Sequence, residues 1–166
     1  MKKYIITDIG TSRDRDEFER FGLEIKEIDK DMLLNVYCDD GMEYIYGKKA
    51  RKNGDIIEGD LYIRFAEFVK KTDSELMHKW TRLEWSKVWP EMEVVVKVTK
   101  VMNDYHICGI TDITDEGILI KFENEITDLN TNKRYFKEGD TILLKATLGL
   151  DIWGHIENVK KLYGID

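Results

Sequence analysis

Residues 138–148 read Glu138-Gly139-Asp140-Thr141-Ile142-Leu143-Leu144-Lys145-Ala146-Thr147-Leu148, an acidic turn that opens directly into an apolar strand. The same turn stands at Glu58-Gly59-Asp60, before the apolar-rich residues 61–68. Upstream of each copy lies a second acidic pair before a glycine, at Asp39-Asp40-Gly41 and Asp115-Glu116-Gly117. We interpret this order of strand, turn, strand, crossing segment, turn and strand as an internal duplication. The alternative is that both copies simply follow general β-turn chemistry.

Alternation of apolar and polar residues predicts strands in both halves of the chain. In the first half they cover residues 4–7, 23–28, 32–38, 42–46 and 61–69. In the second half they cover residues 94–101, 105–113, 117–122, 141–148 and 155–162. The second half fits best the pattern of an OB-like barrel, which has five short strands with a crossing between the third and the fourth. A short helix is predicted near the start of the chain, over about 13–21.

Residues 73–89 are predicted to form one amphipathic helix that ends before Pro90. At 100° per residue its apolar side chains fall on two nearly opposite sides, with Leu76, Trp80 and Leu83 on one and Trp85 and Trp89 on the other. A helix that is apolar on two sides usually lies between two packed surfaces. We therefore expect this helix to connect the two β units.

The expected fold class is β-rich α+β, with two small OB-like, five-stranded barrel-type β units joined by one amphipathic helix. The expected division of the chain is 1–22 as an N-terminal strand–helix segment, 23–72 as the first β unit, 73–90 as the connecting helix and 91–166 as the second, OB-like β unit. The alternative is a single mixed β sandwich with one long helix. No motif in the chain identifies a family.

The composition limits the cellular setting and the class of partner. The chain has 166 residues and a net charge of -7, from 26 Lys and Arg against 33 Asp and Glu. It contains no run of about 18 apolar residues, so we expect no membrane span. Two cysteines, Cys38 and Cys108, make no disulfide framework, and a cytoplasmic protein with free thiols is expected.

Tyrosines next to a basic loop form the candidate binding surface. OB-like barrels bind oligomers with aromatic side chains that stack and basic side chains that meet phosphates. The candidate binding residues are Tyr44, Tyr46, Lys48, Lys49, Arg51, Lys52 and Trp153. In the second half Tyr105, Phe122, Lys121, Lys133 and Arg134 make a comparable set. The alternative is an aromatic core beside a solvated basic loop.

Metal binding and catalysis have little support in the residue pattern. His106 and Cys108 share one face of a predicted strand, and with His155 they are weak candidate zinc ligands. The alternative is a buried cysteine and two ordinary polar histidines. No nucleophile–base pair stands out, so no catalytic residue is assigned and no cofactor is expected.

Three functions follow from these observations. The first is a non-catalytic intracellular binding module that recognises a protein partner through an acidic surface. The second is an OB-type single-stranded nucleic-acid binder, and the third is a small enzyme with an unrecognised site. The net charge favours the first over the second, because nucleic-acid binders gain affinity by neutralising phosphates, although charges can be segregated by face.

Overall fold

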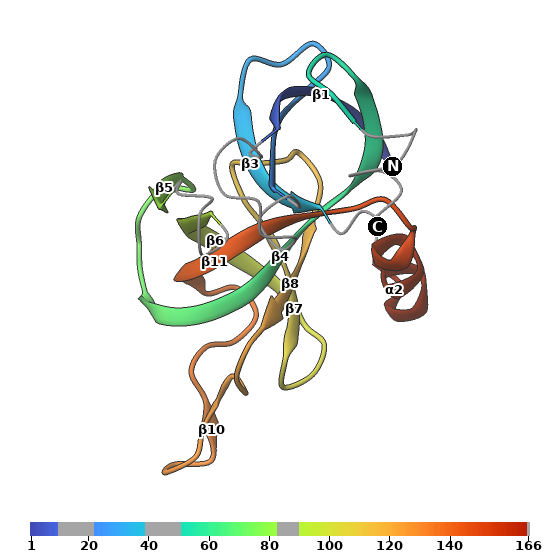
Figure 1. Cartoon of the computed structure of the whole chain (residues 1–166). Coiled ribbons are helices and arrows are strands. Elements are labelled where there is room, and N and C mark those ends of the chain that lie inside the picture. Colours follow the sequence, from blue (N-terminus) through green and yellow to red (C-terminus); the bar gives the residue numbers. More distant parts are fainter. Residues whose placement is uncertain (10–21, 39–50, 83–89, 166) are drawn as a thin grey trace.

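The computed structural model describes residues 1–9, 22–38, 51–82 and 90–165, and these residues are β-rich with one short helix (Figure 1). The strands are β1 (Lys2–Ile9), β2 (Gly22–Glu27), β3 (Leu33–Cys38), β4 (Ile56–Lys71), β5 (His78–Arg82), β6 (Glu91–Val101), β7 (His106–Ile110), β8 (Ile118–Phe122), β9 (Thr127–Asp128), β10 (Lys133–Arg134) and β11 (Thr141–Asp151). The helix is α2 (His155–Tyr163). This confirms the β-rich class predicted from the sequence.

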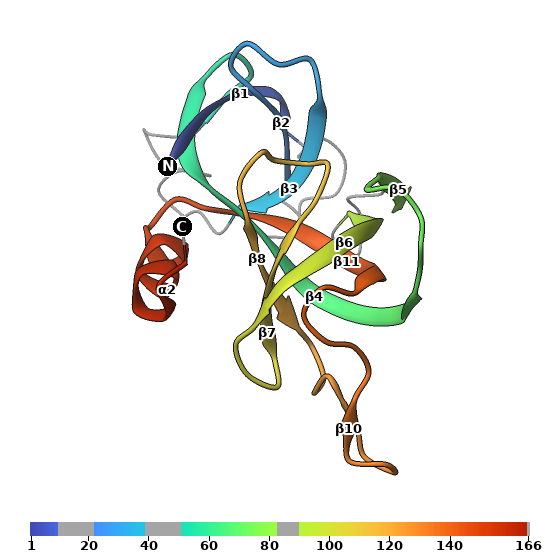
Figure 2. The same ribbon diagram turned by 180° about the vertical axis from the view of Figure 1, so that it is seen from behind.

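The main sheet is mixed and closes on itself twice. Its order is β1-β2-β3-β11-β4-β8-β7-β6-β5, with additional pairings between β1 and β4 and between β11 and β6. The first circuit of strands therefore runs β1-β2-β3-β11-β4 and returns to β1, and the second runs β6-β7-β8-β4-β11 and returns to β6. Each circuit contains one parallel pair, β3 with β11 and β8 with β4. Figure 2 shows the second circuit from behind, with β6, β7 and β8 beside β4.

The two long strands belong to both circuits. β4 and β11 pair antiparallel from Ile142 opposite Lys71 to Asp151 opposite Asp60. The two stretches that the sequence marks out, 58–68 and 138–148, are thus neighbours in space. Phe65 has a φ of 51° and lies at the register shift between Ile63 and Ala66, so β4 bulges within the segment that pairs with β8.

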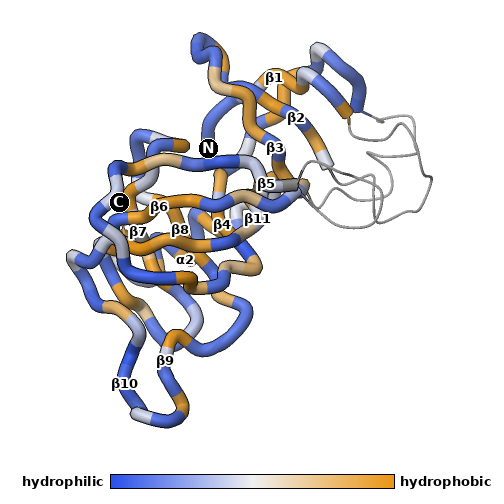
Figure 3. The backbone as a smooth tube through the Cα atoms, turned by 90° about the vertical axis from the view of Figure 1, so that its left-hand side faces the viewer, coloured by the Kyte–Doolittle hydropathy of each residue, from blue (hydrophilic) through white to orange (hydrophobic). Residues whose placement is uncertain are grey.

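The core follows the alternation of apolar residues along these strands. Fully buried side chains point into the circuits from both shared strands, for example Ile63 of β4 and Leu144 and Leu148 of β11. Figure 3 shows hydrophobic residues spread along β6, β7 and β8 beside β4 and β11. One cluster of buried residues extends through both circuits.

A tight turn over residues 52–55 leads into β4. The N–H of Lys52 donates to Oδ2 of Asp55 at 3.0 Å, and the N–H of Asp55 donates back to the carbonyl of Lys52 at 3.1 Å. Gly54 has a φ of 91°, which favours glycine. The turn is tied to β1, because the N–H of Gly54 and the carbonyl of Asp55 hydrogen-bond to Ile6 at 2.8 and 2.9 Å.

The turn over residues 137–140, which leads into β11, repeats each of these bonds. The N–H of Lys137 donates to Oδ2 of Asp140 at 2.9 Å, and the return bond measures 3.1 Å. Gly139 has a φ of 89°, and its N–H and the carbonyl of Asp140 bond to Val98 of β6 at 2.8 and 2.9 Å. Both turns have the sequence Lys-x-Gly-Asp.

The turn expected at Glu58-Gly59-Asp60 is wrong, because Gly59 lies inside β4. A Cβ atom at Gly59 would stand 2.7 Å from the carbonyl oxygen of Asp151, so glycine is needed there for the close approach of β11. The turn whose hydrogen bonds match those of residues 137–140 is therefore the one at 52–55.

The helix expected over 73–89 is wrong over residues 78–82, which form β5. β5 pairs antiparallel with β6, with His78 opposite Val94 and Trp80 opposite Met92. Pairing with the free edge of β6 outweighs the helical spacing of apolar residues, because secondary structure depends on tertiary context. Residues 83–89, including Trp85 and Trp89, lie outside the described residues.

The strand expected over 155–162 is wrong, because these residues form α2. Ile156 and Val159 are three residues apart, a spacing that suits one face of a helix, and they pack against Cys108 and Leu119. Gly164 ends the helix with a φ of 66°. In the part of the chain that the structure describes, no helix is long and apolar enough to cross a membrane.

Some expectations stay predictions. The helix at 13–21 and the strand at 42–46 lie outside the described residues. The division of the chain at 22/23, 72/73 and 90/91 also stays a prediction, although the described part of the segment at 73–90 contains a strand and β4 and β11 each pair with strands of both halves.

Candidate functional site

An open cleft of about 490 Å³ lies at the base of the β9–β10 hairpin, which projects from the body of the molecule (Figure 1). We call it the hairpin-base cleft, and it is lined by Lys71, Val101, Arg134, Phe136, Lys137 and Glu138. Its volume falls within the range of about 300–1,000 Å³ that is common for ligand sites.

Four segments that are distant in sequence meet at this cleft. Lys71 ends β4, Val101 ends β6, and Arg134 lies in β10. Lys137 and Glu138 belong to the Lys-x-Gly-Asp turn, and Oε1 of Glu138 accepts a hydrogen bond from the N–H of Val101 at 3.1 Å. The turn that starts β11 therefore supplies two of the charged residues of the cleft, and the Glu138 side chain is held by Val101.

The cleft carries three cations and one anion. The Lys71 ammonium lies 3.2 Å from Oδ2 of Asp140, and the Arg134 guanidinium lies 3.6 Å from Oδ1 of Asp104. Among the described residues, no carboxylate lies within 4.0 Å of the Lys137 ammonium. The pKa of Asp140 is lowered, first by the hydrogen bond from the Lys137 N–H and also by Lys71. The lining is thus cationic in a chain whose net charge is -7.

Aromatic rings connect the cleft to the core. Phe68 of β4 stacks on Tyr135 with ring centroids 5.3 Å apart and an interplanar angle of 15°. Phe68 also contacts Phe136 at 5.4 Å, and Phe136 contacts Phe122 at 5.7 Å. Phe136 is 2% exposed, whereas Tyr135 is 41% exposed. The exposed Tyr135 does not line the cleft itself, but it lies in the chain between two residues that do, Arg134 and Phe136.

Three of the candidate binding residues lie within the described part of the chain, and none of these three lines this cleft. Tyr44, Tyr46, Lys48 and Lys49 lie outside the described residues. Arg51 precedes the turn at 52–55, and Lys52 begins it. Trp153 is 53% exposed between β11 and α2, and its N–H donates to Oδ1 of Asp151 at 3.1 Å. Arg51, Lys52 and Trp153 do not line the hairpin-base cleft.

The comparable set in the second half contributes one residue to the cleft, Arg134. Sequence reasoning missed Lys71, Lys137 and Tyr135. A usable signal was present, because both halves contain two basic residues shortly before Lys-x-Gly-Asp: Lys48-Lys49 before Lys52 and Lys133-Arg134 before Lys137.

The weak zinc candidates occupy three different environments. The side chain of His106 hydrogen-bonds to Oδ1 of Asn103 at 3.0 Å, and its pKa is lowered first by burial and then by Lys121. Burial raises the pKa of the Cys108 thiol, and His155 is exposed at the start of α2. Within the described ranges, no three His, Cys, Asp or Glu side chains are arranged to hold a metal ion.

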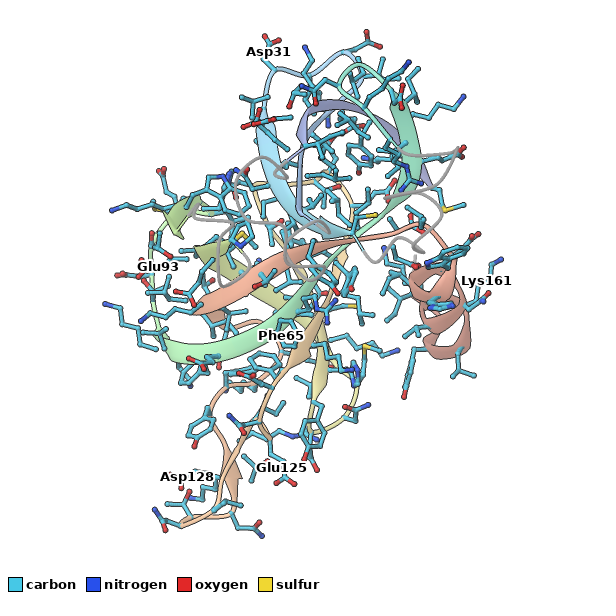
Figure 4. The ribbon with its side chains drawn as sticks, in the orientation of Figure 1. Asp31, Phe65, Glu93, Glu125, Asp128 and Lys161 are labelled. Carbon is cyan, nitrogen blue, oxygen red and sulfur yellow. The ribbon has the colours of Figure 1, made fainter. Side chains whose placement is uncertain are left out.

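A second cavity, of about 240 Å³, has the opposite charge. Its lining includes apolar Met32, Leu34 and Ile113 and the acidic Glu27, Asp112 and Asp115, with Lys30 as its cation. Lys30 lies 3.1 Å from Glu27 and 2.9 Å from Asp115. Asp112 also hydrogen-bonds to Nδ1 of His78 at 2.8 Å. In Figure 4, Asp31 marks the β2–β3 turn at the end of the molecule opposite the hairpin.

An arginine is sandwiched where the two circuits meet. The guanidinium of Arg64 lies 4.4 Å from the ring centroid of Tyr37 and 4.2 Å from that of Phe65, and it donates to the Tyr62 hydroxyl at 3.2 Å. Figure 4 places Phe65 near the middle of the molecule, on β4. Because these rings already stack on Arg64, we interpret the cluster as a contact that holds β3 against β4.

Comparison with known proteins finds no matching family model, no matching curated protein and no matching solved structure. Function is therefore argued from the geometry and charge of the sites alone.

Proposed function

We propose that this protein is a non-catalytic binding module that holds single-stranded nucleic acid in the hairpin-base cleft. One observation carries the proposal: Lys71, Arg134 and Lys137 line one cleft, and the exposed Tyr135 directly follows Arg134 in the chain. Proteins that bind single strands combine a cationic groove for the phosphates with aromatic rings on which the bases stack. The cleft supplies the cations, and Tyr135, next to Arg134 in the chain, supplies the exposed ring.

The strand order supports the same proposal. We propose that each circuit is an OB-like, five-stranded barrel and that the two barrels arose by duplication, with each half lending its long strand to the other. The identical hydrogen bonds of the turns at 52–55 and 137–140 support this duplication. OB-like barrels are frequent binders of oligonucleotides, although a fold alone does not establish a function.

The net charge disfavours binding of nucleic acid, but the distribution of charge over the surface favours it. Acidic side chains such as Glu27, Asp112 and Asp115 gather around the second cavity, whereas cations dominate the hairpin-base cleft. A basic face on an acidic protein is sufficient for phosphate binding, since phosphates respond to local charge at distances below about 10 Å.

Recognition of a protein partner in the cytoplasm is the second candidate function. The second cavity favours it, because acidic Asp112 and Asp115 stand beside apolar Met32 and Ile113. This combination suits a basic protein segment with an apolar anchor. Catalysis has less support, because no Ser, Thr or Cys side chain hydrogen-bonds to His78 among the described residues.

The test is fluorescence anisotropy with labelled oligothymidine and oligouridine of about 12 nucleotides, a length within the usual site sizes. We expect the logarithm of the affinity to fall linearly with the logarithm of the salt concentration, with a slope of about -0.7 per contacted phosphate. The double variant R134E/K137E should abolish binding. The matched control is Lys161→Glu, which makes half the charge change of the double variant on α2, away from the cleft.

Two results would overturn the proposal. One is the absence of binding by the wild type at low salt. The other concerns the affinity of Lys161→Glu. If the logarithm of its affinity falls by half or more of the fall in the double variant, the effect is one of net charge. A lysine-rich peptide that binds the wild type where oligonucleotides do not would favour the protein partner.

A further inference from the structure

We infer that Tyr135 stacks on one unpaired base of the nucleic acid held by the hairpin-base cleft, so that the cleft takes single strands and rejects duplexes. The inference rests on the proposed function and deepens it, because it assigns the selection of single strands over duplexes to one residue. It concerns a residue that contacts a base and not a phosphate. It therefore requires the ligand to carry a base, which the cationic side chains do not require.

The exposure of Tyr135 sets it apart from its aromatic neighbours. Tyr135 is 41% exposed, whereas Phe136 and Phe122 in the same cluster are 2% and 4% exposed. One face of the Tyr135 ring is covered by Phe68, at a centroid distance of 5.3 Å and an interplanar angle of 15°. The exposed area therefore belongs to the opposite face and the ring edge, where a base can stack.

The ring is held in place before any ligand arrives. The N–H of Tyr135 donates to the carbonyl of Ile126 at 2.9 Å, and the preceding residue, Arg134, pairs with Thr127 across the hairpin. Phe68 fixes the plane of the ring from the β4 side. Stacking on an aromatic ring that is already ordered costs little conformational entropy.

Cations stand on both sides of Tyr135 in the chain. Arg134 precedes it and Lys137 follows two residues later, and both line the cleft. The ion pair between Arg134 and Asp104, at 3.6 Å, is exposed, and surface pairs of this kind are weak enough for a phosphate to replace the carboxylate. A base on Tyr135 would thus have its neighbouring phosphates close to Arg134 and Lys137.

Duplex nucleic acid does not satisfy this arrangement. In a duplex both faces of each base are already stacked on neighbours, and only the edges are accessible in the grooves. A ring that offers one flat face can engage a base only when the base is unpaired or displaced, as in single strands.

The competing explanation is that Tyr135 only shields Phe68 and Phe136 from water. The two explanations differ in what the ligand must contain. A shielding role makes the base unnecessary, whereas a stacking role makes the affinity depend on the base and on the aromatic ring together.

The experiment measures the affinity of the full-length protein for three fluorescent ligands at one fixed, low salt concentration. The ligands are oligothymidine, an abasic oligomer with the same number of phosphates, and a duplex of equal length. The proteins are the wild type, Tyr135→Phe, which keeps the ring, and Tyr135→Leu, which keeps an apolar cover over Phe68. Thermal unfolding of each variant monitors the shielding role.

We expect the wild type to bind oligothymidine about 10-fold more tightly than the abasic oligomer or the duplex. Tyr135→Phe should bind oligothymidine like the wild type. Tyr135→Leu should bind it about 10-fold more weakly and bind the abasic oligomer unchanged. Equal wild-type affinity for oligothymidine and the abasic oligomer would overturn the inference even if Tyr135→Leu failed to fold.

Two other outcomes are also decisive. Tight binding of the duplex contradicts base stacking, and so does an equal loss of affinity by Tyr135→Leu for oligothymidine and for the abasic oligomer. Either result leaves the cationic cleft as a binding site. Failure of the wild type to bind any of the three ligands overturns the proposed function itself, and this result is distinguishable from the others because oligothymidine binding is then absent.

Discussion

The carbonyl oxygen of Asp140 accepts a hydrogen bond from the N–H of Val98 at 2.9 Å, which ties the turn before β11 to β6. Asp55 and Ile6 form the same bond at the same distance in the first circuit. The two long strands therefore begin in the same way, each held by the first strand of its own half. Since β4 and β11 complete both circuits, these two turns control where the shared strands start.

Asp55→Ala and Asp140→Ala should each lower the free energy of unfolding by about 1–2 kcal/mol, because each leaves a lysine N–H of the turn without its acceptor. The two losses should be similar and nearly additive, since the turns share no partner. Urea denaturation followed by tryptophan fluorescence measures this. The control is Asp73→Ala, at an exposed residue after β4. A cost at one turn alone would argue against the equivalence of the two turns.

Replacing each of three glycines by alanine should lower the stability by an amount that depends on why glycine is needed there. Gly54→Ala and Gly139→Ala place a Cβ in open space but at a φ of 91° or 89°, so each should cost about 1–2 kcal/mol of backbone strain. Gly59→Ala brings a Cβ within 2.7 Å of the Asp151 carbonyl oxygen, where β11 cannot move without disturbing both circuits. We expect its cost to exceed that of the other two, by at least about 1 kcal/mol.

Thermal unfolding of the three alanine variants gives this ranking directly. The control is Asn130→Ala, at an exposed position. A residue such as Val101 is not suitable because it packs against the core. A Gly59→Ala protein as stable as Gly54→Ala would mean that β4 and β11 are not in close contact at this point.

The sequence predicted the strands well where apolar residues alternate, as at β2, β3, β6, β8 and β11. It failed at β5, because the edge of β6 that β5 covers is a feature of the folded sheet and has no local signal. It failed at α2, where the three-residue spacing of Ile156 and Val159 suits a helix face and not the alternation of a strand. The carboxylate that accepts the N–H of Ile156 in the first turn of α2, that of Asp151, belongs to the preceding strand.

The candidate site was only partly predictable for a similar reason. Arg134 was among the basic residues noted in the second half, but Lys71 reaches the cleft only because β4 continues into the second circuit. The sequence also suggested Glu-Gly-Asp as the repeated turn, since the three residues match. The hydrogen bonds instead select Lys-x-Gly-Asp, in which the lysine supplies the N–H that the aspartate accepts.

The pKa of Asp140 is lowered in the folded protein, so its charge contributes to stability. The sign follows from linkage: the contribution is complete above the unfolded-state pKa, near 4, and disappears as the pH falls through the lower folded-state pKa. Asp140→Asn should therefore lose stability relative to the wild type at pH 7, and the difference should shrink below about pH 4. Chemical denaturation between pH 3 and 7 tests this, and a difference that grows on acidification would contradict it.

The Asp151 carboxylate should keep α2 packed against Cys108. Oδ2 of Asp151 accepts the N–H of Ile156 at 2.9 Å in the first turn of α2, and Oδ1 accepts the N–H of Trp153. Cys108 is 1% exposed and packs in the same cluster as Ile156. Asp151→Ala should weaken the start of α2 by about 1–2 kcal/mol and so raise the population of molecules in which this thiol is accessible.

In a Cys38→Ala background, Cys108 is the one remaining thiol. Its reaction with a chromogenic disulfide at pH 8 should be slow in the folded protein, because burial also raises the pKa of Cys108 and the thiolate is the reactive form. Asp151→Ala should accelerate the reaction about 10-fold, which corresponds to 1.4 kcal/mol of local opening. Glu157→Ala, at an exposed position of the same helix, is the matched control and should react at the original rate. An unchanged rate in Asp151→Ala would show that the packing of Ile156 and Val159, rather than the carboxylate, keeps α2 in place.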